Sequence, residues 1–140
     1  MAEMENMTCG NRSCQSNQKW SIGNDVRTIL LSDSAVSGYV GNKIYPIVAP
    51  ENIKDEFIVY KRDKYAKRAT KMGVYEDECE LFINAISDNY DTAIAIASAI
   101  DNALTGTHII DGKRTNIELA DSTEDFDDDK YIETLLFIIK

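Results

Sequence analysis

The residues with the clearest capacity for chemistry are charges of opposite sign on two neighbouring segments. The first segment carries one acid, Asp63, among six cations: Lys61, Arg62, Lys64, Lys67, Arg68 and Lys71. The second carries three acids at every other position: Glu76, Glu78 and Glu80. Charges sorted in this way favour pairing between protein surfaces, either between copies of the chain or with a partner. We predict that these charged residues, together with Tyr65, form a subunit or partner interface.

Several interpretations of each segment remain open. The basic segment is a solvated hairpin tip, a loop that docks on an acidic neighbour with Tyr65 and Met72 as apolar contacts, or a loop that touches DNA in a channel. The three glutamates form an ordinary solvated strand face, pair with the basic loop across a subunit boundary, or line a channel whose negative field keeps DNA from adhering.

The other reactive residues form no recognisable catalytic or metal-binding pattern. His108 has no serine or cysteine in a nucleophile motif to act with. Cys9 and Cys14 are loosely spaced for zinc, with Cys79 in a predicted strand. The acidic tract from Asp121 to Asp129 lacks the glycine and the distal glutamate of an EF-hand loop, so we expect a solvated loop. We therefore predict no catalytic residue, no metal, no cofactor and no enzymatic activity.

Length and charge narrow the class of protein further. The chain of 140 residues is long enough for one domain with a hydrophobic core and too short for two ordinary ones. Its net charge of −9 repels phosphate backbones and argues against general nucleic-acid binding. Three cysteines, an odd number, suggest a reduced cytosolic setting. Because neither a signal peptide nor a long apolar run is visible, we expect a soluble protein that does not enter a membrane.

The first 21 residues differ in composition from the rest. Met1 to Ser21 is rich in polar residues and carries one large aromatic residue, Trp20. This composition predicts a flexible N-terminal arm, because it offers little apolar surface to offset the entropy of ordering. The alternative is an arm that orders against a neighbouring subunit with Trp20 as its anchor. We assign residues 22–140 to a single domain.

Apolar periodicity in that domain predicts helices and strands in a definite order. Two short helices, the first capped by Asn24 or Asp25, precede an edge segment that contains Pro46. A long amphipathic helix, capped by Ser87 or Asp88, has its apolar stripe at Tyr90, Ala93, Ile94, Ala97, Ile100 and Leu104. The predicted strands are Phe57–Tyr60, Val74–Ala85 with Cys79, Leu81, Ile83 and Ala85 buried, Asn116–Ala120, and a central Tyr131–Ile139. The fold class is α+β: a mostly antiparallel sheet of four to five strands, with the long helix packed on it and short N-terminal helices.

In this order the elements resemble the small tail-completion or tail-terminator proteins of long-tailed bacteriophages and prophages. The opening, Val26 to Pro46, resembles that family's two helices and its strand leading to a Tyr-Pro pair. Phe57–Tyr60 resembles its next strand, Glu78 to Leu104 its strand-then-helix signature, and Tyr131 to Ile138 its closing strand. The resemblance covers residues 24–140, and the chain departs from it in the polar arm and in the acidic tract.

The resemblance implies a function in virion assembly. It implies a structural subunit of a ring, often hexameric, at the head-proximal end of a phage tail, which ends tube polymerisation and joins tail to head. The implied partners are other copies of the chain, the tail tube protein and a head–tail connector or stopper protein, with DNA only in transit. The implied location is the virion tail or neck, after assembly in the bacterial host cytoplasm. The alternative is a small non-enzymatic binding or regulatory module of a prophage or mobile element.

Overall fold

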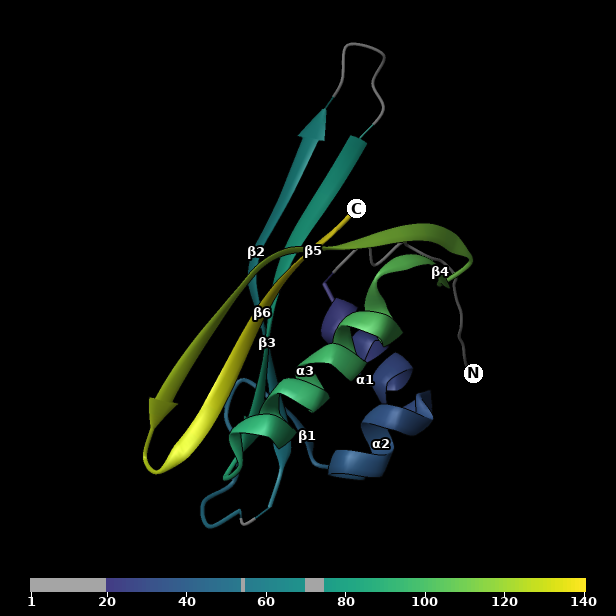
Figure 1. Cartoon of the computed structure of the whole chain (residues 1–140). Helices are drawn as coiled ribbons and strands as arrows, with labels where there is room; N and C mark the ends of the chain where they lie inside the picture. Colours follow the sequence, from purple (N-terminus) through teal and green to yellow (C-terminus); the bar gives the residue numbers. More distant parts are fainter. Residues whose placement is uncertain (1–19, 54, 70–74) are drawn as a thin grey trace, which may run out of the picture.

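The computed structural model describes residues 20–53, 55–69 and 75–140. Its elements in chain order are α1 (Ile22–Ser32), α2 (Ser34–Val40), β1 (Ile44–Pro46), β2 (Phe57–Ala69), β3 (Tyr75–Ser87), α3 (Tyr90–Leu104), β4 (Gly106–Ile110), β5 (Lys113–Asp127) and β6 (Lys130–Ile139). The strands form one curled sheet in the order β1-β2-β3-β6-β5-β4, and all three helices lie on one of its faces (Figure 1). The predicted α+β class is confirmed.

The sheet is larger than predicted and mixed in direction. It has six strands, where four to five were expected, and β1 runs parallel to β2 while the other neighbours are antiparallel. The additional strand is β4, a five-residue edge strand that follows Gly106. The edge position of Pro46 is confirmed by β1, and the central position of the last strand is confirmed by β6, which lies between β3 and β5.

Two segments predicted as loops are strands. The basic segment after Tyr60 belongs to β2, which continues to Ala69, because its residues pair along the whole length of β3. The acidic tract belongs largely to β5, which continues to Asp127, because the apolar strand β6 pairs with it as far as Lys130. In both hairpins the backbone ladder supports charged residues that carry no strand signal of their own. The two hairpins leave the sheet at opposite ends (Figure 1).

The core lies between the sheet and the helices. Cys79, Leu81, Ile83 and Ala85 of β3 are buried there as predicted. The stripe of α3 is rotated from the prediction, since Ile96 and Ala99 are buried while Ile94 is 39% exposed. Apolar residues surround much of this helix, so the period of 3.6 alone did not decide which side faces the sheet. The other buried helix residues are Ile22, Val26, Leu30, Val36, Val40, Ala93, Ile100 and Leu104.

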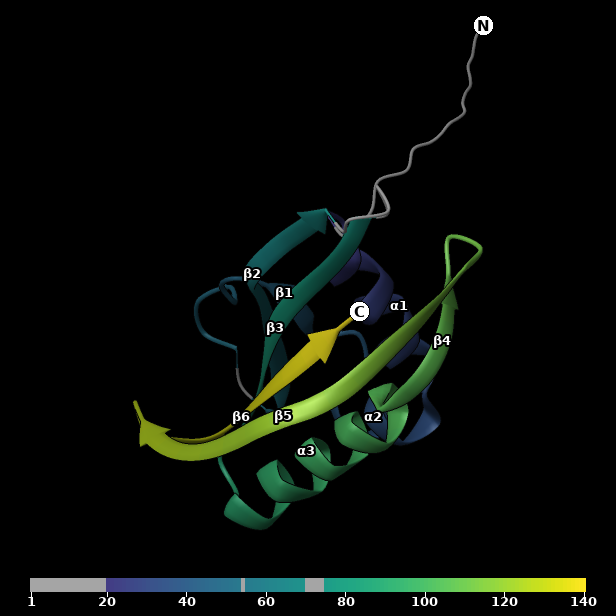
Figure 2. The same ribbon diagram turned by 90° about the horizontal axis from the view of Figure 1, so that it is seen from above.

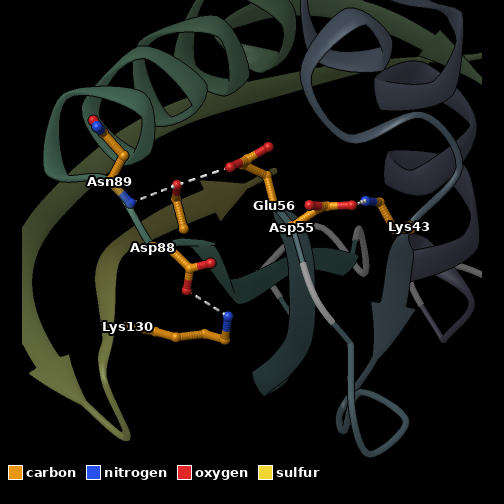
Figure 3. Close-up of polar contacts among 7 residues, drawn as sticks. Lys43, Asp55, Glu56, Asp88, Asn89 and Lys130 are labelled. Atoms are coloured by element: carbon orange, nitrogen blue, oxygen red, sulfur yellow. Dashed lines mark hydrogen bonds and ion pairs between the residues drawn. The ribbon is translucent and has the colours of Figure 1, made fainter.

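Polar contacts fix where the helices begin. α1 follows Ser21, earlier than the predicted caps at Asn24 or Asp25. The cap of α3 is Asn89, next to the predicted positions, and its side chain accepts a hydrogen bond from the backbone N–H of Thr92 at 3.0 Å. The buried hydroxyl of Ser87 accepts from the Asn89 N–H at 3.1 Å and donates to Glu56 at 3.2 Å (Figure 3).

A second polar contact joins the same helix end to β6. Lys130 Nζ donates to Asp88 Oδ1 at 2.7 Å (Figure 3). The N-terminus of α3 is therefore tied to the beginnings of both β2 and β6, and the helix direction across the sheet is set at this point.

The opposite face of the sheet has no helix over it within the described residues (Figure 2). Alternation along the paired strands places Phe82, Ile86, Leu136 and Ile138, all half-buried, on this face. Exposed charges lie on both sides of this apolar strip: Lys61 and Lys64 on β2, and Glu118, Asp121 and Asp125 on β5.

Candidate assembly surfaces

The strands β2 and β3 contain nine of the ten residues of the predicted interface, all but Lys71, and their register sets positions of opposite charge across from one another within one chain. In the register of the hairpin Lys64 lies opposite Glu80, Lys67 opposite Asp77 and Arg68 opposite Glu76. Opposite charges directly across two antiparallel strands stabilise the pairing modestly. The acidic strand is therefore a partner of the basic segment in the same molecule.

The described side chains of this hairpin divide between its two faces. On the face that the helices leave open, Lys61 and Lys64 are exposed, and Glu78 and Glu80 are half-buried. Lys140 Nζ lies 3.8 Å from Glu78 Oε1. The side chains of Lys67, Arg68 and Glu76 lie outside the described part, as do the whole of Lys71 and Met72.

On the helix-bearing side, Arg62 and Tyr65 gather around Trp20. Arg62 Nη1 donates to the backbone oxygen of Trp20 at 2.8 Å, and its guanidinium lies 4.8 Å from the indole centroid. The rings of Trp20 and Tyr65 meet edge to face at 5.3 Å, and the Tyr65 hydroxyl donates to Asp77 at 3.0 Å. Trp20 is nevertheless 62% exposed, so it anchors to its own β2 and still presents a large aromatic surface.

A cavity of about 270 Å³ lies beside this cluster. Its apolar walls are Trp20, Pro46, Ile47 and Tyr60, and Lys61 and Arg62 also line it. Ile47 is 70% exposed and has φ of 65°, a left-handed conformation that β-branched residues rarely adopt. Strain of this kind costs of the order of 1–3 kcal/mol and is concentrated at functional sites. Sequence reasoning missed this surface, for which the only signal was an Ile-Val pair directly after Pro46.

A pair of carboxyl groups lies between the sheet and the start of α3. Glu133 is 6% exposed and lies opposite Glu124 in the register of β5 and β6. Burial, followed by the hydrogen bond and charge of Glu124, raises the pKa of Glu133 to about 7. The Tyr90 hydroxyl donates to Glu124 Oε2 at 2.8 Å, and this bond raises the pKa of Tyr90. The ring of Tyr131 packs against Tyr90 and against Phe126, with centroids 5.5 and 4.8 Å apart.

The remaining reactive residues lie apart from these surfaces. His108 Nε2 is 2.7 Å from the backbone oxygen of Leu104, at the end of α3. It lines a cavity of about 240 Å³ with Asp25 and Asp111, where burial and then Asp111 raise the pKa of Asp25. Cys79 is buried in the core, whereas Cys9 and Cys14 fall outside the described residues.

Metal-binding clusters and membrane-spanning helices are both absent from the described part of the chain. Within residues 20–53, 55–69 and 75–140, no three His, Cys, Asp or Glu side chains are placed to hold a metal ion. None of the helices in the same ranges has the length and apolar character needed to cross a membrane.

Comparison with known proteins finds a similar fold among solved structures. No protein-family model and no curated protein matches the sequence. Among solved structures, a chain in the virion of a native gene transfer agent (GTA) particle matches with a TM-score of 0.71. The fold is similar to that of this chain of the virion. The match covers 81% of this protein and 89% of the virion chain, at 22% sequence identity. The helix-covered sheet described above is thus shared across nearly the whole length of a protein found in a virion particle.

Proposed function

We propose that this protein is a structural virion component, and specifically a tail terminator or tail-completion subunit. The observation that carries the proposal is the match to 89% of a virion chain. The order of motifs from Val26 to Ile138, which resembles the tail-terminator family, supports the finer assignment. In this role the protein is not an enzyme and holds no cofactor. Its place is the tail or neck of the virion, after assembly in the host cytoplasm.

The proposed subunit acts by forming a ring, hexameric in keeping with the resemblance, at the head-proximal end of the tail. Contacts between unlike surfaces of successive copies generate a closed ring when the rotation closes. Such a ring presents one face to the tail tube and a different face to the connector. Tube polymerisation ends because the second face offers no site for another layer of tube protein, while the connector joins tail to head. DNA passes through the ring in transit, and the negative charge of the subunit discourages adhesion.

The alternative is a small binding or regulatory module that holds an acidic partner. The exposed Lys61 and Lys64 on β2 favour this alternative, because they are available to such a partner. The two functions differ in what the purified protein does on its own and with tube protein.

Native mass spectrometry of the protein, alone and then mixed with the tail tube protein encoded beside it, tests the proposal. We expect a closed ring, formed either spontaneously or on the tube end. A template is compatible with the proposal, since weak interfaces between subunits often require one. A protein that stays monomeric and does not bind the tube would contradict the terminator function and favour the binding module.

A further inference from the structure

The tip of the β5–β6 hairpin presents an apolar residue in acidic surroundings. Phe126 is 54% exposed and stands between Asp125 and Asp127, with Asp128 and Asp129 forming the turn that follows. One side of its ring packs on Tyr131, which holds the ring in place. The nearest cation along the chain, Lys130, is engaged by Asp88. The tip therefore presents an exposed aromatic side chain, Phe126, surrounded by aspartates.

The cavity beside Trp20 has the complementary properties. Its walls are apolar, and Arg62, whose guanidinium lies on the Trp20 ring on this side of the sheet, lines it. Trp and Arg side chains beside a small pocket, here the exposed Trp20 and the half-buried Arg62, are among the residues that most often dominate binding energy at protein interfaces. The cavity of about 270 Å³ is small for a ligand pocket, for which about 300–1,000 Å³ is usual, and suits a single side chain.

These two features cannot meet within one molecule. Lys61 lies level with Phe82 of β3, whereas Phe126 is level with Tyr131 and, through it, with Ser87 of β3. Five residues of strand separate the two levels, or about 17 Å, and three strand spacings add about 14 Å in the perpendicular direction. A contact between tip and cavity must therefore join two copies of the chain.

We propose that the β5–β6 tip of one copy docks on the Trp20 cavity of the next copy, with Phe126 in the cavity. The aspartates of the turn, Asp128 and Asp129, then lie near Arg62. Because the two surfaces are different, the contact is heterologous, and repeating it produces a ring or an open filament. This inference rests on the proposed function only in requiring contact between copies, and it names the residues that make that contact.

Site-specific photo-cross-linking tests the contact directly. A benzoylphenylalanine placed at position 126 is irradiated in the full-length protein at high concentration and in the tube-bound assembly. We expect covalent dimers in which the cross-linked peptide contains residues 20–24 or 46–62. The same probe at Ile109, which is 69% exposed on β4, serves as the control and should give no such product. Cross-links from position 126 to another region, or none in either sample, would overturn the proposal.

Paired substitutions test the direction of the contact. Phe126→Ser removes the aromatic side chain of the tip and Arg62→Glu reverses the charge at the cavity, while Ile109→Ser and Lys113→Glu are exposed control changes on the β4–β5 hairpin. We expect each of the first two to weaken self-association at least about tenfold and the controls to leave it unchanged. Mixed together, Phe126→Ser and Arg62→Glu should form 1:1 heterodimers, because one variant keeps the cavity and the other keeps the tip. Mixtures that give no heterodimer, from variants with wild-type melting temperatures, would contradict the contact.

The outcomes separate this inference from the proposed function. Tails that terminate normally with Phe126→Ser and show no cross-link at position 126 would leave the terminator function standing and overturn the tip contact. Cross-linked copies that fail to bind tube protein would support the contact and contradict the terminator function.

Discussion

At the scale of single residues, the glycine in the first turn of α1 has a packing role. A Cβ built on Gly23 would lie 2.8 Å from Cε2 of Tyr60, whose ring is buried between α1 and β2. We expect Gly23→Ala to lower the free energy of unfolding by about 1–3 kcal/mol, because the ring must move within a packed core. Gly38→Ala in α2 is the matched control, since nothing lies within 4 Å of its Cβ. It should gain about 0.5–1 kcal/mol from helix propensity. Urea unfolding of both variants measures the difference, and equal effects would contradict the close approach.

A second prediction at this scale concerns Glu133. Its pKa is about 7 in the folded protein and about 4.5 when unfolded, so between these values the folded state holds more protons. The contribution of Glu133 to the free energy of unfolding is therefore greatest below pH 4.5 and falls as the pH rises through 7. At about 1.4 kcal/mol per pKa unit, a rise from 4.5 to about 7 makes this loss of the order of 3 kcal/mol.

Glu133→Gln keeps a hydrogen-bond donor toward Glu124 and removes the titratable carboxyl group. We expect this variant to match the wild type near pH 5 and to exceed its stability near pH 8 by about 2–3 kcal/mol. Denaturant unfolding at both pH values measures this, with the exposed Glu118→Gln on β5 as control. A Glu133→Gln variant with the same pH dependence as the wild type would show that the buried carboxyl does not hold the extra proton.

At the scale of elements, the start of α3 depends on a few polar contacts. The side chain of Asn89 caps the helix and its N–H binds the Ser87 hydroxyl. We expect Asn89→Ala to cost about 1 kcal/mol of stability, since it removes the acceptor for the Thr92 N–H. Asn102→Ala, an exposed change inside the same helix, should be neutral or slightly stabilising. Thermal unfolding compares them, and a neutral Asn89→Ala would mean that water replaces the cap.

Some of these elements were predictable from apolar periodicity in the sequence, and others were not. The bounds of α3 and the buried face of β3 were predictable because apolar residues recur there at the periods of a helix and a strand. β4 and the acidic half of β5 were not, since five residues after a glycine and a run of aspartates carry no such period. Their structure comes from pairing with a neighbouring strand, which is information distributed over the fold. The cavity beside Trp20 was missed for the same reason, because β1, β2 and the start of α1 meet only in three dimensions.

At the scale of the whole molecule, capping and sequestration of tube protein make different demands on stoichiometry. A ring that caps a tube stops elongation with one ring per tube end, so a small fraction of the tube-protein concentration is enough. A module that binds free tube protein must match it copy for copy. We therefore expect substoichiometric amounts of this protein to shorten tubes assembled in vitro while leaving the total mass of polymer nearly unchanged, because new tubes replace longer ones.

Electron microscopy gives the tube lengths and sedimentation gives the polymer mass in the same samples. The Arg62→Glu variant, in which successive copies are predicted not to dock, should need a higher concentration to produce the same shortening. The matched Lys113→Glu variant should act as the wild type does. A fall in polymer mass in proportion to added protein, with no change in length, would instead identify a binding module. Capping at unchanged concentration by Arg62→Glu would keep the terminator function and move the contact between copies to another surface, such as the open face of the sheet.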